Sequence, residues 1–171
     1  MEKGYVHVYT GNGKGKTTAA LGLSLRAVCA GKKVYFAQFV KGMAYSELKA
    51  ADLLENFTLK QYGRDGFILN NPTEEDKAMA KEGLDELRVI LKEGQYDVVV
   101  LDEINIALYY KLFDVEEVID MIKNRKEHVE VILTGRNALE SIKVFADLVS
   151  EIKEIKHYYK QGVQARIGIE K

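Results

Sequence analysis

Short apolar runs alternate along the chain with longer stretches that mix apolar and polar residues. The short runs are rich in Val, Ile, Tyr and Phe, a composition typical of β-strands. We expect strands at the following ranges: 5–9, 33–39, 57–62, 96–103 and 128–135. The alternating pattern of DLVSEIKEI, 147–155, predicts a further strand closer to an edge of the sheet.

The longer stretches are rich in helix-forming residues. The first predicted helix, 16–30, ends before Gly31, and glycine is common just after a helix C-terminus. A long polar helix opens at Asn71-Pro72-Thr73 and continues through Glu93. Shorter helical segments are expected around 104–111, 114–124 and 138–146.

Strands that alternate with helices predict an α/β fold with a mostly parallel sheet of about six strands and right-handed crossovers. The run VVVL within 96–103 is continuously apolar, which is expected for a strand with helices over both faces of the sheet. Ligands in such folds bind at the carboxyl ends of the strands. We therefore expect the functional residues to follow the strands.

The bulk composition narrows the class of protein. The 171 residues suit a single domain, 1–171, and 47% apolar with 30% charged residues is a globular, soluble composition. The net charge of -1 lacks the basic excess of a nucleic-acid surface, and the ten tyrosines form no stripe for stacking bases. The N-terminal MEKGYVHVYT has too short an apolar run for a signal peptide or a membrane span. We expect no nucleic-acid or membrane partner and a cytoplasmic location.

Cysteine and histidine offer little chemistry. The single cysteine, Cys29, cannot form an internal disulfide, and its apolar helical surroundings predict a small buried core residue. His7, His128 and His157 show no metal-ligand spacing, so we interpret them as structural.

A glycine-rich loop, TGNGKGKTT, connects the first predicted strand to the first helix. The phosphate-binding pattern is G-x-x-x-x-G-K-[ST], and here Thr10 takes the place of the leading glycine. Such a loop needs backbone N–H groups that curl toward an anion, the positive end of a helix, a lysine and a metal-binding hydroxyl. The residues that meet these needs are Gly11, Gly13 and Gly15 for the curl, Lys16 for the outer phosphates, Thr17 for the metal, and Asn12, Lys14 and Thr18 for further contacts.

Thr10 predicts a tighter or differently shaped entry to the loop without loss of the amide cradle. The alternative is a glycine-rich turn before a surface helix, which the flanking strand and helix disfavour. With this loop in place, the predicted three-layer fold is of the P-loop NTPase type.

Two carboxylates end the apolar strand VVVLDE. Asp102, Glu103 or both would hold Mg²⁺ directly or through water, together with Thr17. In a hydrolase, Glu103 would instead orient water as a base. The alternative is a strand that simply ends in solvent, and the sequence does not decide which carboxylate contacts the metal.

Three further basic residues are candidates for binding phosphate. Arg136 follows the strand VEVIL and suits phosphate through its planar fork, although a solvated loop arginine is an equal alternative. Arg26 interrupts an apolar helix face. A buried guanidinium there would need a phosphate or carboxylate partner, and the alternative is a side chain that extends to solvent at the edge of that face. Lys41, in QFVKG after the second predicted strand, is expected with Gln38 near the ligand-binding edge of the sheet. The alternative is that Lys41 is an ordinary surface lysine.

Five segments occur in an order that resembles one enzyme family. They are TGNGKGKTTAA, QFVKG, VVVLDE, LTGR and GVQARIGIE. Together they resemble the P-loop type of cob(I)alamin or cob(I)yrinic acid a,c-diamide (corrinoid) adenosyltransferase, over nearly the whole chain. The resemblance implies transfer of the 5′-deoxyadenosyl group of ATP to cobalt(I), with release of triphosphate. It also implies Mg²⁺ or Mn²⁺, an electron-donating reductase, and a cytoplasmic homodimer.

On this resemblance the catalytic residues are Lys16, Thr17 and Glu103, and the metal ligands are Thr17, Asp102 and Glu103. Because the attacked atom is the ribose C5′, we hypothesise that ATP lies reversed in the loop with its γ-phosphate deep. Lys14 beside Lys16 suits an intact triphosphate as leaving group.

The sequence departs from the family pattern in three places. Only Met1 to Gly4 precede the first strand, where the family often has a basic extension. Phe67 is kept as a corrinoid contact, but Leu69 stands where the family can have tryptophan. The tail has Gln164 and Arg166 where Lys and Gln are expected.

Two other functions are compatible with the same loop. A P-loop kinase or ATPase acting on phosphorus would give ADP or AMP. A nucleotide-gated binding module would bind ATP without turnover.

Overall fold

The computed structural model describes residues 2–65 and 71–171. Its strands form one six-stranded sheet with the order β3-β2-β4-β5-β1-β6, and each neighbouring pair is parallel. The strands are β1 Val6–Thr10, β2 Val34–Phe39, β3 Phe57–Tyr62, β4 Val98–Asp102, β5 Glu130–Thr134 and β6 Leu148–Glu151. This is the predicted α/β fold of the P-loop NTPase type.

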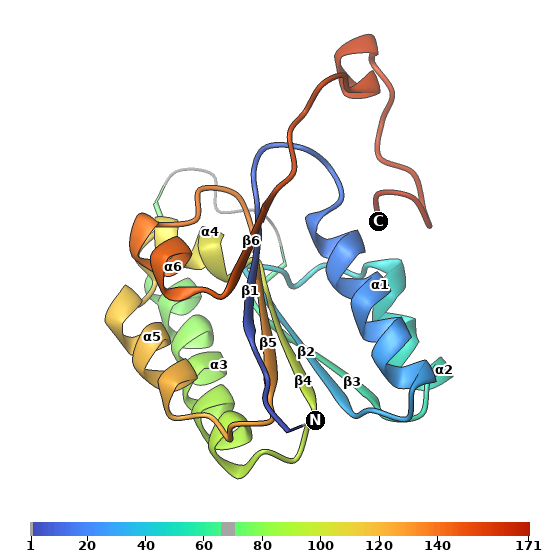
Figure 1. Ribbon diagram of the computed structural model, residues 1–171. Helices are drawn as coiled ribbons and strands as arrows, with labels where there is room; N and C mark the ends of the chain where they lie inside the picture. Colours follow the sequence, from blue (N-terminus) through green and yellow to red (C-terminus); the bar gives the residue numbers. More distant parts are fainter. Residues whose placement is uncertain (1, 66–70) are drawn as a thin grey trace.

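Helices cover both faces of the sheet, as predicted (Figure 1). The helices are α1 Lys16–Cys29, α2 Ala50–Leu53, α3 Glu74–Glu93, α4 Ile104–Tyr109, α5 Val115–Lys123 and α6 Glu140–Phe145, with 3₁₀ turns η1 Ser46–Lys49 and η2 Tyr158–Gln161. Figure 1 shows α1 and α2 on one side and the other four helices on the opposite side. The turn η1 and the short helix α2 were not predicted from the sequence.

Two cores separate the three layers. The larger core packs Leu84, Leu87 and Leu91 of α3 and buried residues of α4, α5 and α6 against the sheet. The smaller core lies under α1 and includes Ala20 and Phe36. Strand β4 is buried at all five positions, which confirms that its continuous apolar run lies between two layers.

Local sequence explains where the long helices begin. Thr73 caps α3, since its hydroxyl accepts the Asp76 N–H and the Asp76 carboxylate accepts the Thr73 N–H. Asp114 and Glu117 form the same reciprocal cap at α5. Gly94, in the left-handed region, follows the end of α3.

Strand β6 lies at an edge of the sheet, as its alternating pattern predicted. The prediction that Cys29 is a buried core residue is wrong, because its side chain is exposed. The buried face of α1 carries Lys16, Ala20 and Ser24, spaced four apart, and Cys29 lies off that face. Within residues 2–65 and 71–171, no helix combines the length and apolar character needed to cross a membrane.

Candidate active site

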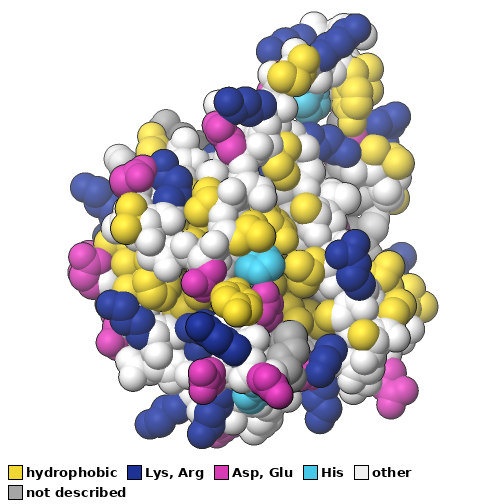
Figure 2. All heavy atoms as spheres, viewed as in Figure 1, with side chains coloured by type: hydrophobic (Ala, Val, Ile, Leu, Met, Phe, Trp, Pro, Cys, Tyr) yellow, Lys and Arg dark blue, Asp and Glu magenta, His cyan; other side chains and the backbone are white. Residues whose placement is uncertain are grey.

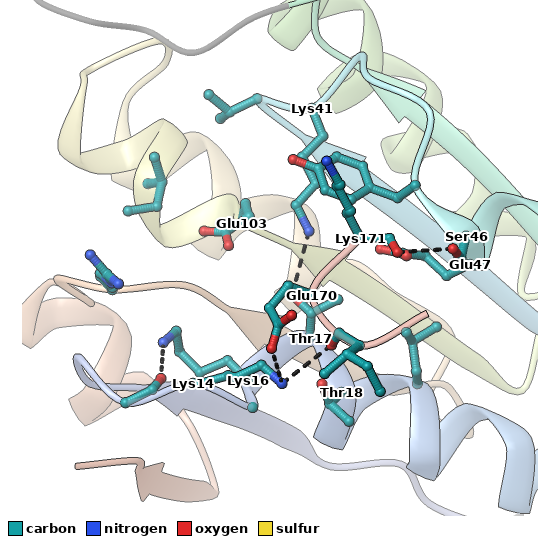
Figure 3. Close-up of a pocket in the computed structure, with 18 of the residues that line it drawn as sticks. Lys14, Lys16, Thr17, Thr18, Lys41, Ser46, Glu47, Glu103, Glu170 and Lys171 are labelled. Carbon is teal, nitrogen blue, oxygen red and sulfur yellow. Dashed lines mark hydrogen bonds and ion pairs between the residues drawn. The ribbon is translucent and has the colours of Figure 1, made fainter. Parts of the chain in front are cut away.

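A cavity of about 780 Å³ opens at the carboxyl ends of the strands (Figure 3). Most of the predicted site residues line it: Gly13, Lys14, Gly15, Lys16, Thr17, Thr18, Lys41, Glu103 and Arg136. They come from the loop after β1, the turn after β2, the end of β4 and the loop after β5. This convergence is the one that a parallel sheet predicts.

The phosphate loop begins one residue later than the usual pattern suggests. Thr10 is the last residue of β1, and its hydroxyl accepts the Ala138 N–H at 3.3 Å. The turn starts at Gly11, with φ of 99°, and ends at Gly15, with φ of 119°. A β-branched residue is suited to extended backbone, so threonine at position 10 fits the strand and leaves the loop intact.

The loop backbone packs against the segment that follows β6. The Gly13 N–H donates to the Ile152 carbonyl at 2.8 Å, and the Ile152 N–H donates to the Thr10 carbonyl at 2.8 Å. A Cβ atom on Gly11 would lie 2.4 Å from the Ile152 carbonyl oxygen. Glycine at position 11 is therefore required by a close backbone approach as well as by its positive φ.

Lys16 lies at the floor of the cavity and is 8% exposed. Its ammonium donates to the Gly13 carbonyl at 2.7 Å, which holds the side chain back across the loop. Burial lowers the pKa of Lys16, with Arg136 acting in the same direction and Glu103 and Asp102 opposing it. The lysine is thus a partly desolvated cation, whose attraction for an anion is stronger than in bulk water.

Asp102 is fully buried at the end of β4 and accepts hydrogen bonds from four side chains. Thr17 and Thr134 donate to Oδ1 at 2.9 and 2.6 Å. Gln38 and Lys41 donate to Oδ2 at 3.3 and 2.8 Å. The pairing of Asp102 with Lys41 was not predicted, although both were expected at this edge of the sheet.

Glu103 follows Asp102 in the left-handed region, with φ of 60°, and precedes α4. Its N–H donates to the Thr134 hydroxyl at 3.0 Å, and its side chain reaches the cavity. Burial raises the pKa of Glu103, the Asp102 charge adds to the rise, and Lys41, Lys16 and Arg136 oppose it. Glu103 is therefore a carboxylate whose charge a further cation would stabilise.

Four predicted site residues lie outside the cavity lining: Gly11, Asn12, Arg26 and the fully buried Asp102. Arg26 is exposed on α1, away from the face that meets the loop. Gly11 packs against the backbone of Ile152, and Asn12 is exposed. Phe67, the predicted corrinoid contact, falls outside the described residues.

The tail after β6 returns across the mouth of the cavity (Figures 1 and 3). Lys14 donates to the Ile169 carbonyl at 3.2 Å and lies 3.5 Å from Glu170, while Ser46 donates to the Lys171 carbonyl at 2.9 Å. These contacts link both sides of the opening.

The tail is held by polar contacts, because Ile155 and Ile167 are 91% and 83% exposed. Figure 2 shows the segment standing out from the body of the molecule before it returns. Hydrogen bonds from Arg166 and Tyr158 lower the pKa of Glu170 to about 2, so this carboxylate stays charged.

Comparisons with known proteins identify one enzyme family. A model of the family described as ATP:corrinoid adenosyltransferase BtuR/CobO/CobP matches residues 2–170. The chain belongs to this family. Corrinoid adenosyltransferase of Escherichia coli strain K12 is 39% identical over 171 residues, which cover 99% of this chain and 86% of the relative.

Two further relatives of this chain are also named as corrinoid adenosyltransferases. Corrinoid adenosyltransferase CobA of Salmonella typhimurium strain LT2 is also 39% identical over 171 residues, covering 99% and 86% of the two chains. Corrinoid adenosyltransferase of a Sinorhizobium species is 38% identical over 177 residues, covering 99% and 81%. The family is enzymatic, so the chain is a transferase that uses ATP and a corrinoid.

The adenosyltransferase site has the oxygen donors that a magnesium ion requires. Mg²⁺ is usually bound by one or two carboxylates together with waters and substrate phosphates. Thr17, Asp102 and Glu103 supply a hydroxyl and two carboxylates beside the phosphate loop. Within the described residues no group of three or more His, Cys, Asp or Glu gathers to hold a metal.

Sequence reasoning missed several residues of the adenosyltransferase cavity. His157, interpreted as structural, lines the cavity, and its Nδ1 accepts the Tyr159 N–H at 3.0 Å. Glu47 and residues 168–171 also line it. The tail motif GVQARIGIE was the one available signal, but nothing in it predicts contact with a loop at the other end of the chain.

Proposed function

We propose that this enzyme transfers the 5′-deoxyadenosyl group of ATP to cobalt(I) of cobalamin or cob(I)yrinic acid a,c-diamide and releases inorganic triphosphate. The observation that carries the proposal is the set of cations around one cavity: Lys14, Lys16, Lys41 and Arg136. Such a set suits a leaving group that bears several negative charges and departs intact.

In the proposed reaction, the electron pair of cobalt(I) forms a bond to the ribose C5′. The C5′–O5′ bond breaks, its electron pair leaves on the triphosphate oxygen, and cobalt is oxidised to cobalt(III). The corrinoid supplies the nucleophile, so the protein has to bind, align and shield the two substrates.

The basic residues and the loop amides would bind the polyphosphate of ATP. Lys16 and the amides of the loop bind the polyphosphate, and Lys14 and Arg136 neutralise charge nearer the mouth of the cavity. We propose that ATP lies with its γ-phosphate deep in the loop, since this order turns the ribose toward the corrinoid. A nucleotide complex with the kinase-like α-to-γ order would refute this arrangement.

Mg²⁺ or Mn²⁺ would be held by Thr17 with Asp102, Glu103 or both. A divalent ion at this position supplies positive charge that offsets the charge developing on the triphosphate. The half-buried Glu103, whose pKa is raised, is assigned here to the metal and not to activation of water.

The partners follow from the resemblance. We propose a cytoplasmic homodimer that receives cobalt(I) from an electron-donating reductase, with Phe67 as a corrinoid contact. Analytical ultracentrifugation tests the dimer, and a single species at the mass of one 19.3 kDa chain would exclude it.

One assay tests the function. The protein is incubated without oxygen with MgATP and a chemically reduced corrinoid, and the products are separated and identified. Adenosylated corrinoid with triphosphate supports the proposal. ADP and phosphate formed without corrinoid would support a kinase or ATPase, and ATP binding without turnover would support a binding module.

A further inference from the structure

The ammonium of Lys41 lies where two proposed metal ligands meet. Its Nζ atom is 2.8 Å from Asp102 Oδ2 and 3.5 Å from Thr17 Oγ1. The Thr17 hydroxyl donates its proton to Asp102 Oδ1, so its lone pairs are directed away from the carboxylate. A lysine ammonium therefore lies beside the two oxygens that would face a divalent ion.

Burial and charge hold this lysine in place. The side chains of Lys41 and Asp102 are 15% and 0% exposed, and an unpaired buried carboxylate is costly. The carboxylates of Asp102, Glu103 and Glu47 all attract the Lys41 ammonium. The ring of Tyr45 lies on another side of the ammonium, with its centroid at 5.3 Å.

The backbone at Lys41 leaves little freedom, so any movement is confined to the side chain. Val40 has φ of 58°, which is unusual for a β-branched residue and is held by the surrounding structure. A Cβ atom on Gly42 would lie 2.3 Å from the Arg64 carbonyl carbon. The segment that follows β2 is therefore in tight contact with the segment that follows β3. Lysine has four rotatable side-chain bonds, which suffice to carry its ammonium into the cavity.

We propose that Lys41 is a built-in counter-ion that occupies the metal position of Asp102 and Thr17 until a polyphosphate draws it into the cavity. This inference rests on the metal ligands assigned under the proposed function. A divalent ion bound to Asp102 would lie close to the Lys41 ammonium, and the two positive charges would repel each other. The metal can therefore bind Asp102 only when the Lys41 ammonium has moved away. Lys41 also lines the cavity. Under the proposed function the phosphate oxygens of ATP would enter this cavity and would be a second partner for the ammonium.

The proposal predicts that the free enzyme binds Mn²⁺ weakly because of Lys41. Removing the ammonium with Lys41→Met should tighten Mn²⁺ binding in the absence of nucleotide by about tenfold, a typical size for coupling between sites. Lys14→Met is the matched control, since it removes one charge from the same cavity without a contact to Asp102, and its effect should be smaller. The double variant Lys41→Met/Asp102→Asn should lose the gain.

Mn²⁺ binding is measured by electron paramagnetic resonance of the free ion, with circular dichroism to confirm folding. If Lys41→Met does not fold, Lys41→Gln replaces it, because its amide still donates to Asp102 without charge. Equal or weaker Mn²⁺ binding in the folded variant overturns the inference. A wild-type enzyme that forms no adenosylated corrinoid from MgATP overturns the proposed function instead, so the two failures are distinguishable.

Discussion

The close approach of Gly11 to Ile152 makes a quantitative test of how the phosphate loop is supported. In Gly11→Ala, the new Cβ atom would lie 2.4 Å from the Ile152 carbonyl oxygen and 2.9 Å from its nitrogen. Both are backbone atoms, so no side-chain rotation relieves the contact. The segment after β6 has to move away from the loop.

Gly15→Ala provides the matched control. Gly15 also has a positive φ, 119° against 99° for Gly11, but a Cβ atom there meets nothing within 4 Å. Both variants therefore incur backbone strain of about 1–3 kcal/mol. Only Gly11→Ala adds a steric contact, of about 1–3 kcal/mol, and weakens the Gly13–Ile152 hydrogen bond, worth about 1 kcal/mol.

We expect Gly11→Ala to lower the free energy of unfolding by about 2–4 kcal/mol more than Gly15→Ala does. Urea unfolding followed by circular dichroism measures both, and hydrogen exchange should show faster exchange of the Ile152 amide in Gly11→Ala alone. Equal destabilisation by the two variants would show that the contact with the β6 segment does not support the loop.

Three further predictions concern the site and the fold. Lys16→Ala should reduce turnover by about 10²–10³-fold or more through lost contacts to the leaving triphosphate, and unchanged activity in a folded variant would remove Lys16 from this role. Burial acts to raise the pKa of Asp76, but hydrogen bonds from Arg64 and Thr73 outweigh it and keep that pKa below the usual value. Asp76→Asn should therefore cost about 1 kcal/mol of stability at pH 7. Because the folded-state pKa is lowered, this stabilisation is present above the usual carboxyl pKa and is lost as the pH falls through the lowered value, so urea titrations of both proteins should converge in acid. Glu170→Gln should remove the ion pair with Lys14, which keeps its hydrogen bond to the Ile169 carbonyl, and should tighten ATP binding by about two- to fivefold in calorimetry. Weaker binding would assign Glu170 to the nucleotide site.

The regular elements were predictable because their patterns are local. The run FTLKQY predicts a strand at 57–62, where β3 lies. The other predicted strands differ from the observed ones by one or two residues at most ends, but the predicted strand 147–155 continues four residues past the end of β6. The parallel arrangement then placed Lys16, Asp102 and Arg136 at one edge of the sheet.

Features that depend on distant contacts were not predictable. The bond from Lys14 to Ile169 joins residues 155 positions apart, and no periodicity signals it. The same holds for the ion pair between Lys41 and Asp102, which depends on the rotamer of a long side chain. The error at Cys29 had a different cause, since an apolar segment fixes the helix but not the orientation of its last turn.

The position of β1 in the sheet has a consequence for synthesis of the protein. This strand leaves the ribosome before the other five strands, yet its partners are β5 and β6, with Val6 beside Val131 and His7 beside Leu148. At ordinary rates of translation, β1 is made on the order of ten seconds before β5 or β6 has been synthesised. The nucleotide site therefore forms only after β5 and β6 have been made, and ATP can stabilise the molecule only from that point on.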